Sequence, residues 1–175
     1  MVAIAKAAEN GGAAWLTVHG RTKAQMYKPP INWRAIGRAR EAIGIPVVAN
    51  GDLVDEASLA ACTADSGCDA YMIGRGAMAH PDLFRRLRAT ASGSTATMSS
   101  ADLGELLLEY VARTAASVAH DEKRREHKPL VMLKQWLRMG GAHREDLGGW
   151  FEVVKRTQTV GDAQAILRHA IRPAA

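Results

Sequence analysis

The sequence predicts an α/β fold: the C-terminal part of a (β/α)8 TIM barrel, three βα units long, followed by an all-α helical region. Three short apolar runs alternate with stretches of helical periodicity in the first half, and no strand pattern follows them. Strands that alternate with helices indicate a parallel sheet, because a parallel crossover needs a connection about as long as a helix.

The first βα unit follows a short helix. Residues 1–10 have helical composition and end at a glycine pair, which is a typical helix stop. The first predicted strand, residues 15–19, is closed by Gly20. Residues 32–43 then place apolar side chains at helical spacing with arginines between them, so they predict the helix of this unit.

The second and third units repeat this order. Residues 45–51 form an apolar run that ends in a small turn, and Asp55 is expected to cap a helix over 56–65. A third apolar run, residues 70–73, ends at the glycines flanking Arg75. Continuous apolar runs are typical of strands that are covered on both faces.

The rest of the chain predicts a second domain. Residues 91–100 are small and polar, which indicates a linker between a partial barrel, 1–90, and a helical domain, 101–175. Four helices are expected in that domain: 101–119, 128–139, 146–158 and 161–171.

Composition narrows the functional classes. The chain has 47% hydrophobic and 23% charged residues, as globular proteins do, and it lacks an apolar run of about 18 residues or a secretory signal. Two cysteines cannot form a disulfide framework, and they have no metal-ligand partners nearby, so a reducing cytoplasm is expected. The net charge of +5, concentrated in 123–128 and 134–156, favours nucleic acid as partner.

Polar residues and glycines follow each predicted strand, at the end that builds the active site of a (β/α)8 barrel. His19 could donate to a ring acceptor or a phosphate, or it could be satisfied within the barrel rim. The turn at Asn50, Gly51 and Asp52 could form an anion-binding nest, or it could be a simple turn with an aspartate cap.

The third loop carries Gly74, Arg75 and Gly76. Two glycines expose backbone N–H groups and the arginine adds a forked cation, which together suit a phosphate. The alternative is an arginine paired with a neighbouring carboxylate. As the last loop of the series, this one matches the usual phosphate site of such barrels.

Taken together, the runs LTVHGRT, IPVVANGD and GCDAYMIGRG resemble those of the tRNA-dihydrouridine synthases. The resemblance implies an FMN-binding (β/α)8 barrel with a C-terminal helical domain that reduces uridine in the D-loop of tRNA, with NADPH as reductant. The runs HGRTK at 19–23 and KQWL at 134–137 are most similar to the C-type subfamily, which acts on uridine 16. Where C-type relatives tend to carry an arginine, this chain has Met132.

The resemblance also implies roles for single residues. His19 would lie beside the flavin ring, and Gly74 and Arg75 would hold the phosphate. The residues expected to bind FMN are His19, Asn50, Gly51, Asp52, Gly74 and Arg75. Those expected to contact tRNA are Tyr27, Lys134 and Lys155. No residue is expected to bind a metal.

The general acid of the family is a cysteine from the first half of the barrel, so no catalytic residue is assigned here. Cys62 falls in a predicted helix and Cys68 before a strand, at the opposite end of the barrel, and both are expected to be core or rim residues. Three strands leave two open edges. The chain is therefore expected to be a fragment, inactive alone, that closes by self-association or with a separate N-terminal fragment.

Two other functions fit the same residues. One is a non-catalytic RNA-binding module that uses the basic helices without a flavin. The other is a different FMN- or phosphate-binding barrel enzyme, because phosphate loops recur across many chemistries on this fold. The basic KQWL region argues against the second.

Overall fold

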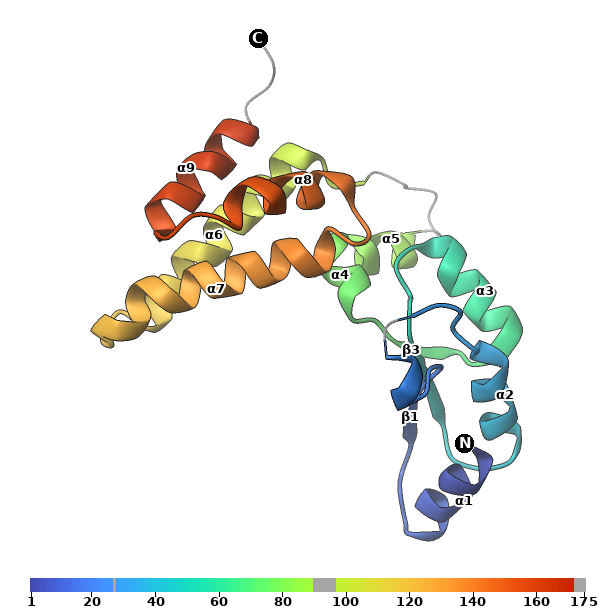
Figure 1. Cartoon of the computed structure of the whole chain (residues 1–175). Helices are drawn as coiled ribbons and strands as arrows, with labels where there is room; N and C mark the ends of the chain where they lie inside the picture. Colours follow the sequence, from blue (N-terminus) through green and yellow to red (C-terminus); the bar gives the residue numbers. More distant parts are fainter. Residues whose placement is uncertain (27, 90–96, 172–175) are drawn as a thin grey trace. The chain divides into compact units, whose positions relative to one another are not determined.

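The computed structural model describes residues 1–26, 28–89 and 97–171 (Figure 1). The chain folds into two compact units, Met1–Ala77 and Met78–Ala175. Most of the predicted linker, and the predicted boundary after residue 90, fall on 90–96, outside the described residues, so that boundary stays a prediction. Within the described ranges, no helix is long and apolar enough to cross a membrane.

Unit 1 contains one three-stranded sheet in the order β1-β2-β3. The strands are β1 (Leu16–His19), β2 (Val47–Asn50) and β3 (Ala70–Met72). Both pairs are parallel, which confirms the sheet type predicted from the alternation of strands and helices. His19 lies opposite Asn50, and Asn50 lies opposite Met72, so the carboxyl ends of all three strands meet at one edge.

Side-chain caps mark the start of the second and third helices of unit 1. The helices of this unit are α1 (Val2–Asn10), α2 (Trp33–Glu41) and α3 (Glu56–Ser66), with a 3-10 turn η1 at Lys23–Gln25. The Asn32 side chain accepts a hydrogen bond from the Ala35 N–H (2.9 Å) at the start of α2. Asp55 accepts one from the Ser58 N–H (2.7 Å), which confirms the predicted cap of α3.

The two faces of this sheet differ. Figure 1 shows α2 and α3 side by side, and they pack on the helix-covered face, where Ile36, Ala49 and Cys62 are buried. Tyr71 points to this face, because its hydroxyl lies 2.6 Å from the Thr63 hydroxyl of α3. Alternate residues of a strand point to opposite faces. The other face, which we call the site face, therefore carries Thr17, His19, Val48, Asn50, Ala70 and Met72.

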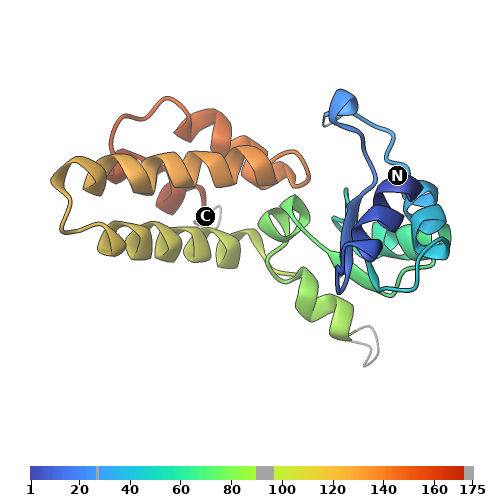
Figure 2. The ribbon, with the colours of Figure 1, turned by 90° about the horizontal axis from the view of Figure 1, so that it is seen from below.

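Unit 2 is helical throughout its described residues. The helix α4 (Arg75–Ala79) spans the division between the units, and unit 2 continues with α5 (Leu83–Ala89), α6 (Ser100–Ser117), α7 (Glu122–Gly140), α8 (Glu145–Val154) and α9 (Val160–Ala170). Figure 2 shows α6 and α7 running alongside each other. The four helices α6 to α9 pack around one core that includes Leu107, Leu137 and Leu167, each with no exposed surface.

Two helices of unit 2 differ from their predictions: α8 ends at Val154 instead of at 158, and α7 starts early. The sequence places the start of the second tail helix at Lys128, but α7 begins at Glu122. Asp121 caps this start by accepting the Arg124 N–H (3.1 Å), and Pro129 lies buried inside the helix instead of limiting it. Proline removes one helical hydrogen bond, a cost that burial in the core offsets. The basic run 123–128 is consequently helical, and its side chains are exposed.

Candidate functional site

The three predicted loops lie together at the carboxyl edge of the sheet in unit 1. The parallel register places His19 beside Asn50 on adjacent strands, and the backbone N–H of Gly20 donates to the Asn50 carbonyl (3.0 Å). Arg75 follows the third strand and contacts Asp52 of the second loop. The chain thus brings all six residues that the sequence predicts for a cofactor to one edge.

His19 is held in one orientation by its own loop. Its Nδ1 accepts a hydrogen bond from the backbone N–H of Arg21 (3.1 Å). A ring nitrogen that accepts carries no proton, so the proton of the neutral imidazole is on Nε2. The side chain is exposed and lies over Gly51, where an added Cβ would be 3.1 Å from His19 Cε1. Nε2–H is therefore a donor at the site face.

Gly51 is required by its backbone geometry. Its φ of +121° lies in a region that L side chains rarely adopt. A Cβ at this position would also overlap the side chain of Ile31. The indole N–H of Trp33 donates to the Gly51 carbonyl (3.0 Å), which fixes the turn from the side of α2. Sequence reasoning missed both Ile31 and Trp33.

Asp52 joins the three loops through two arginines. Arg21 forms a two-pronged ion pair with it, with Nη1 2.9 Å from Oδ1 and a second, shorter bond from Nη2 to Oδ2. Arg75 Nη2 lies 3.4 Å from the same Oδ1. The Arg21 side chain is only 4% exposed, and its Nε donates to the Lys28 carbonyl (3.0 Å). The pairing of Arg75 with a carboxylate, the alternative reading of this loop, is thus observed.

Arg21 is a third residue that the sequence did not predict at this edge. Its signal is its place two residues after the first strand, level with the loop that ends in Asp52. Two guanidinium groups contact one carboxylate here. Such an edge can hold an anion, because arginine forks match the oxygens of phosphate.

The two glycines around Arg75 have opposite surroundings. At Gly74 an added Cβ would meet no atom within 4 Å. At Gly76 the added Cβ would overlap the Leu53 carbonyl oxygen and lie 2.7 Å from Val54 Cα. Gly76 therefore allows the first turn of α4 to pack against the loop after β2, while Gly74 borders open space.

The cysteines lie away from this edge. Cys62 and Cys68 are buried, and both belong to the core on the helix-covered face. Burial raises the pKa of the Cys62 thiol, against a lowering effect of its contact with Ser66 Oγ at 3.8 Å. A thiol of this kind is a packing group and a poor nucleophile or acid at neutral pH.

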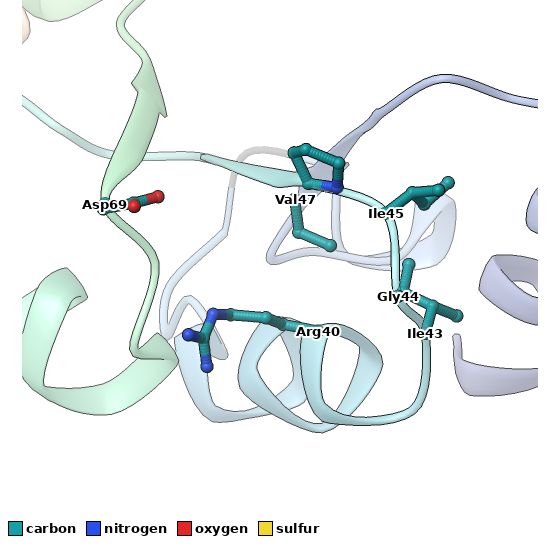
Figure 3. Close-up of a pocket in the computed structure, with 7 residues that line it drawn as sticks. Arg40, Ile43, Gly44, Ile45, Val47 and Asp69 are labelled. Carbon is teal, nitrogen blue, oxygen red and sulfur yellow. The ribbon is translucent and has the colours of Figure 1, made fainter.

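A hollow in unit 1 lies at the opposite edge of the sheet. Figure 3 shows Arg40 of α2, the segment from Ile43 to Val47, and Asp69 around it. Val47 begins β2 and Asp69 precedes β3, so this hollow faces the amino ends of the strands. Loops at that end of a βα sheet serve stability, whereas ligands bind at the carboxyl end.

The residues predicted to contact tRNA have different environments. Tyr27 lies outside the described residues. Lys134 is partly buried, and its Nζ donates to the Thr157 carbonyl (2.6 Å) before α9. Lys155 is exposed and forms an ion pair with Glu152, with its Nζ 5.9 Å from the Phe151 ring centre. Both lysines thus make a bond within unit 2. Each bond uses fewer than the three N–H donors of an ammonium group, so donors remain for a phosphate.

A basic surface lies next to Lys134, in the run 123–128 whose charge favours a nucleic-acid partner. The exposed cations at the start of α7 are Lys123, Arg124, Arg125 and Lys128. Lys123, His127 and Lys134 line a hollow together with Gln158 of the α8–α9 turn and one acidic residue, Glu126. Among these cations, Arg124 pairs with Asp121 (3.3 Å). This surface suits a polyanion.

Comparison with known proteins agrees with these features. The profile of the dihydrouridine synthase (Dus) family matches residues 1–172. The chain belongs to this family. Relatives include the tRNA-dihydrouridine(16) synthases of Neisseria meningitidis serogroup B (33% identical, 89% of this chain and 45% of the relative) and Ralstonia nicotianae (34%, 97% and 50%). That of Salmonella typhimurium is 55% identical over 47% of this chain and 27% of its own length.

Family membership confirms the resemblance drawn from the sequence motifs, and the dihydrouridine synthases are oxidoreductases. The chain spans about half the length of the curated relatives that it matches over most of its own sequence. All six residues of the carboxyl edge and the basic surface of α7 lie inside the matched region.

The KQWL run has a structural explanation in this member of the family. The Trp136 indole N–H donates to the Met78 carbonyl (2.8 Å), and its ring packs edge-on against Tyr110 with the centres 4.7 Å apart. Leu137 is fully buried in the core of unit 2. Two of the four side chains therefore hold the helices together, and Lys134 bonds to the turn before α9.

Proposed function

We propose that this chain supplies one half of the FMN site and the tRNA-binding helices of a tRNA-dihydrouridine synthase that reduces uridine 16 of the D-loop in the cytoplasm. The observation that carries the proposal is the Arg21–Asp52–Arg75 network, which joins three strand-end loops beside His19 and Asn50. It sits at the edge where βα proteins bind ligands.

The donors at this edge fit FMN. Arg75 offers a cation for the phosphate, and the open space at Gly74 leaves room for it. His19 Nε2–H and the Asn50 amide lie side by side on the site face, where they can bond to acceptors of a ring. Asp52 acts through its pairing with Arg75, and Gly51 through the turn that it permits.

Bound FMN would supply the hydride for the C5–C6 bond of uridine, with NADPH as the source of electrons. The residues of this chain bind and orient. Arg21 holds Asp52 in its left-handed conformation (φ +50°), and Asp52 in turn aims Arg75. His19 is fixed by the Arg21 N–H, so its Nε2 proton is presented in one direction.

Reduction also needs a proton for the second carbon of the bond. Neither cysteine of the chain can deliver it at the site face, because Cys62 and Cys68 are buried on the opposite, helix-covered face. We therefore propose that a (β/α)8 barrel forms only with further strands. They would come from an N-terminal segment or a second copy, and they would bring the proton donor. The described chain alone is expected to bind without catalysing reduction.

The tRNA contact is assigned to unit 2. Its exposed cations Lys123, Arg125 and Lys128 lie within the first two turns of α7, with Lys134 and Lys155 further on. Clustered cations neutralise phosphates, so this contact should weaken steeply with salt. The choice of uridine 16 is supported by the relatives, which are tRNA-dihydrouridine(16) synthases.

The test uses the purified chain, FMN and tRNA transcripts. We expect FMN absorbance at about 450 nm to remain with the protein after gel filtration, as for a bound flavin. We also expect salt-dependent tRNA binding, and no dihydrouridine until the N-terminal half of a relative is added. If the chain binds no flavin either alone or after the N-terminal half is added, the cofactor assignment is refuted.

A binding-only function is distinguished by the same experiment. Salt-dependent tRNA binding without any flavin, alone and after addition of the N-terminal half, would favour an RNA-binding module. FMN binding without tRNA affinity would instead favour another FMN barrel enzyme. The variant Arg75→Ala separates the two units, because it should impair FMN retention and leave tRNA affinity unchanged.

A further inference from the structure

Met72 is the one exposed apolar side chain in the row of site-face residues that contains His19 and Asn50. It is 52% exposed, although it belongs to a strand whose other residues are partly buried. The register pairs His19 with Asn50 and Asn50 with Met72. Adjacent strands are separated by about 4.8 Å, so this row spans roughly 10 Å.

The direction of Met72 follows from its neighbour. The Tyr71 hydroxyl contacts Thr63 of α3, which places Tyr71 on the helix-covered face. Successive side chains of a strand point to opposite faces, so Met72 points to the site face. The exposure of Thr17 and His19 and the partial burial of Val18 show the same alternation in β1.

We propose that Met72 is a further cofactor-binding residue, whose thioether packs against the flavin ring from β3, two strands away from His19. This rests on the proposed FMN site. The row then offers a polar end at His19, an amide at Asn50 and an apolar, polarisable end at Met72. Sulfur makes favourable contacts with aromatic rings, and methionine adapts its shape to them. A flavin ring that extends from His19 across Asn50 would cover the exposed side chain of Met72.

Methionine oxidation gives a readout that does not depend on activity. The chain is treated with dilute hydrogen peroxide in the dark, with and without saturating FMN, and each methionine sulfoxide is quantified by mass spectrometry. We expect FMN to slow the oxidation of Met72 at least about fivefold, since reactivity follows exposure. Met1, which is 44% exposed at the start of α1, is the internal control and should not change.

Two substitutions complete the test. Met72→Ala should weaken FMN affinity about tenfold, the order expected for removing one apolar side chain from a contact, and Met72→Leu should stay within about threefold of the unchanged chain. Ile4→Ala, at a 75% exposed position of α1, should leave the affinity unchanged. Circular dichroism should show the same fold for all three variants.

The outcomes separate the two proposals. FMN binding that leaves Met72 oxidation unchanged, or that is equally tight in Met72→Ala, would overturn the role of Met72 and leave the cofactor site standing. Slow oxidation of Met72 already without FMN would show that protein covers it, which also overturns the role. A chain that binds no FMN, alone or with the missing barrel half, would overturn both.

Discussion

The guanidinium of Arg21 forms a two-pronged ion pair with the carboxylate of Asp52, across the carboxyl edge of β1 and β2. Asp52 also contacts Arg75 after β3, so a nearly buried arginine controls the position of the cation that we assign to the cofactor phosphate. Arg21 is not among the residues expected to contact FMN, but it positions Asp52 and, through Asp52, Arg75.

Arg21→Ala should therefore weaken both the fold and FMN binding. Breaking a buried ion pair costs about 3–5 kcal/mol, and we expect roughly 1–3 kcal/mol here because Asp52 remains partly exposed. Urea denaturation followed by circular dichroism measures this. The control is Arg34→Ala, which removes an ion pair with Asp65 on an arginine that is 78% exposed and should cost below about 0.5 kcal/mol. Equal losses in the two variants would contradict the proposed role of Arg21.

The glycines on either side of Arg75 give a matched pair of variants. Gly76→Ala places a Cβ against the Leu53 carbonyl and 2.7 Å from Val54 Cα, so it should destabilise unit 1 by about 2–4 kcal/mol. Gly74→Ala meets no atom within 4 Å and should leave stability within about 0.5 kcal/mol.

The effect on FMN binding should not follow the effect on stability: the variant that keeps its stability, Gly74→Ala, should lose FMN affinity. Gly74→Ala puts a methyl group into the space that we assign to the phosphate, so FMN affinity should fall at least about tenfold in a fully folded protein. Isothermal titration with FMN measures it. Unchanged affinity in Gly74→Ala would place the phosphate elsewhere.

Sequence patterns predicted the elements of unit 1 well because short-range signals determine them. The cap at Asp55 and the parallel order of the strands followed from residues that are near one another in the chain. The Arg21–Asp52 pair could not be predicted, since its two residues meet only through strand register. The start of α7 at Glu122 differs from the predicted start at Lys128, because Asp121 caps the helix and Pro129 is buried inside it.

Acid should weaken unit 2 through Asp146. Burial would raise the pKa of this carboxyl, but hydrogen bonds from Ser100 and Arg144 outweigh burial and hold the pKa below its ordinary value of 3.8. A group with a lowered pKa in the folded state stabilises fully above its unfolded pKa, and that stabilisation is lost as pH falls through the folded pKa.

The stability contributed by Asp146 should thus be constant above about pH 5 and decline as pH falls below 3.8. Denaturation curves of the chain and of Asp146→Asn, recorded between pH 2 and 7 (a range of about two units on the acid side of the ordinary aspartate pKa), measure the contribution. The two curves should converge at the acid end. A constant difference at all pH values would show that the carboxylate charge has no part in joining α6 to α8.

Substitution of Lys134 should lower the stability of the chain, whereas substitution of Lys128 should not. Lys134 Nζ donates to the Thr157 carbonyl in a partly buried setting, so Lys134→Met should cost about 1 kcal/mol of stability as well as one phosphate contact. Lys128 is exposed on the same helix, and Lys128→Met should leave stability unchanged.

Both variants should lower the dependence of tRNA affinity on salt. Each lost phosphate contact reduces the slope of log affinity against log salt by about 0.7–0.9. Filter binding between about 50 and 200 mM salt gives the slopes, and this range is wide enough to resolve a single contact. A Lys134→Met variant that loses stability while keeping the full salt slope would show that Lys134 only holds the turn before α9, and that the RNA backbone is held by the exposed cations at the start of α7.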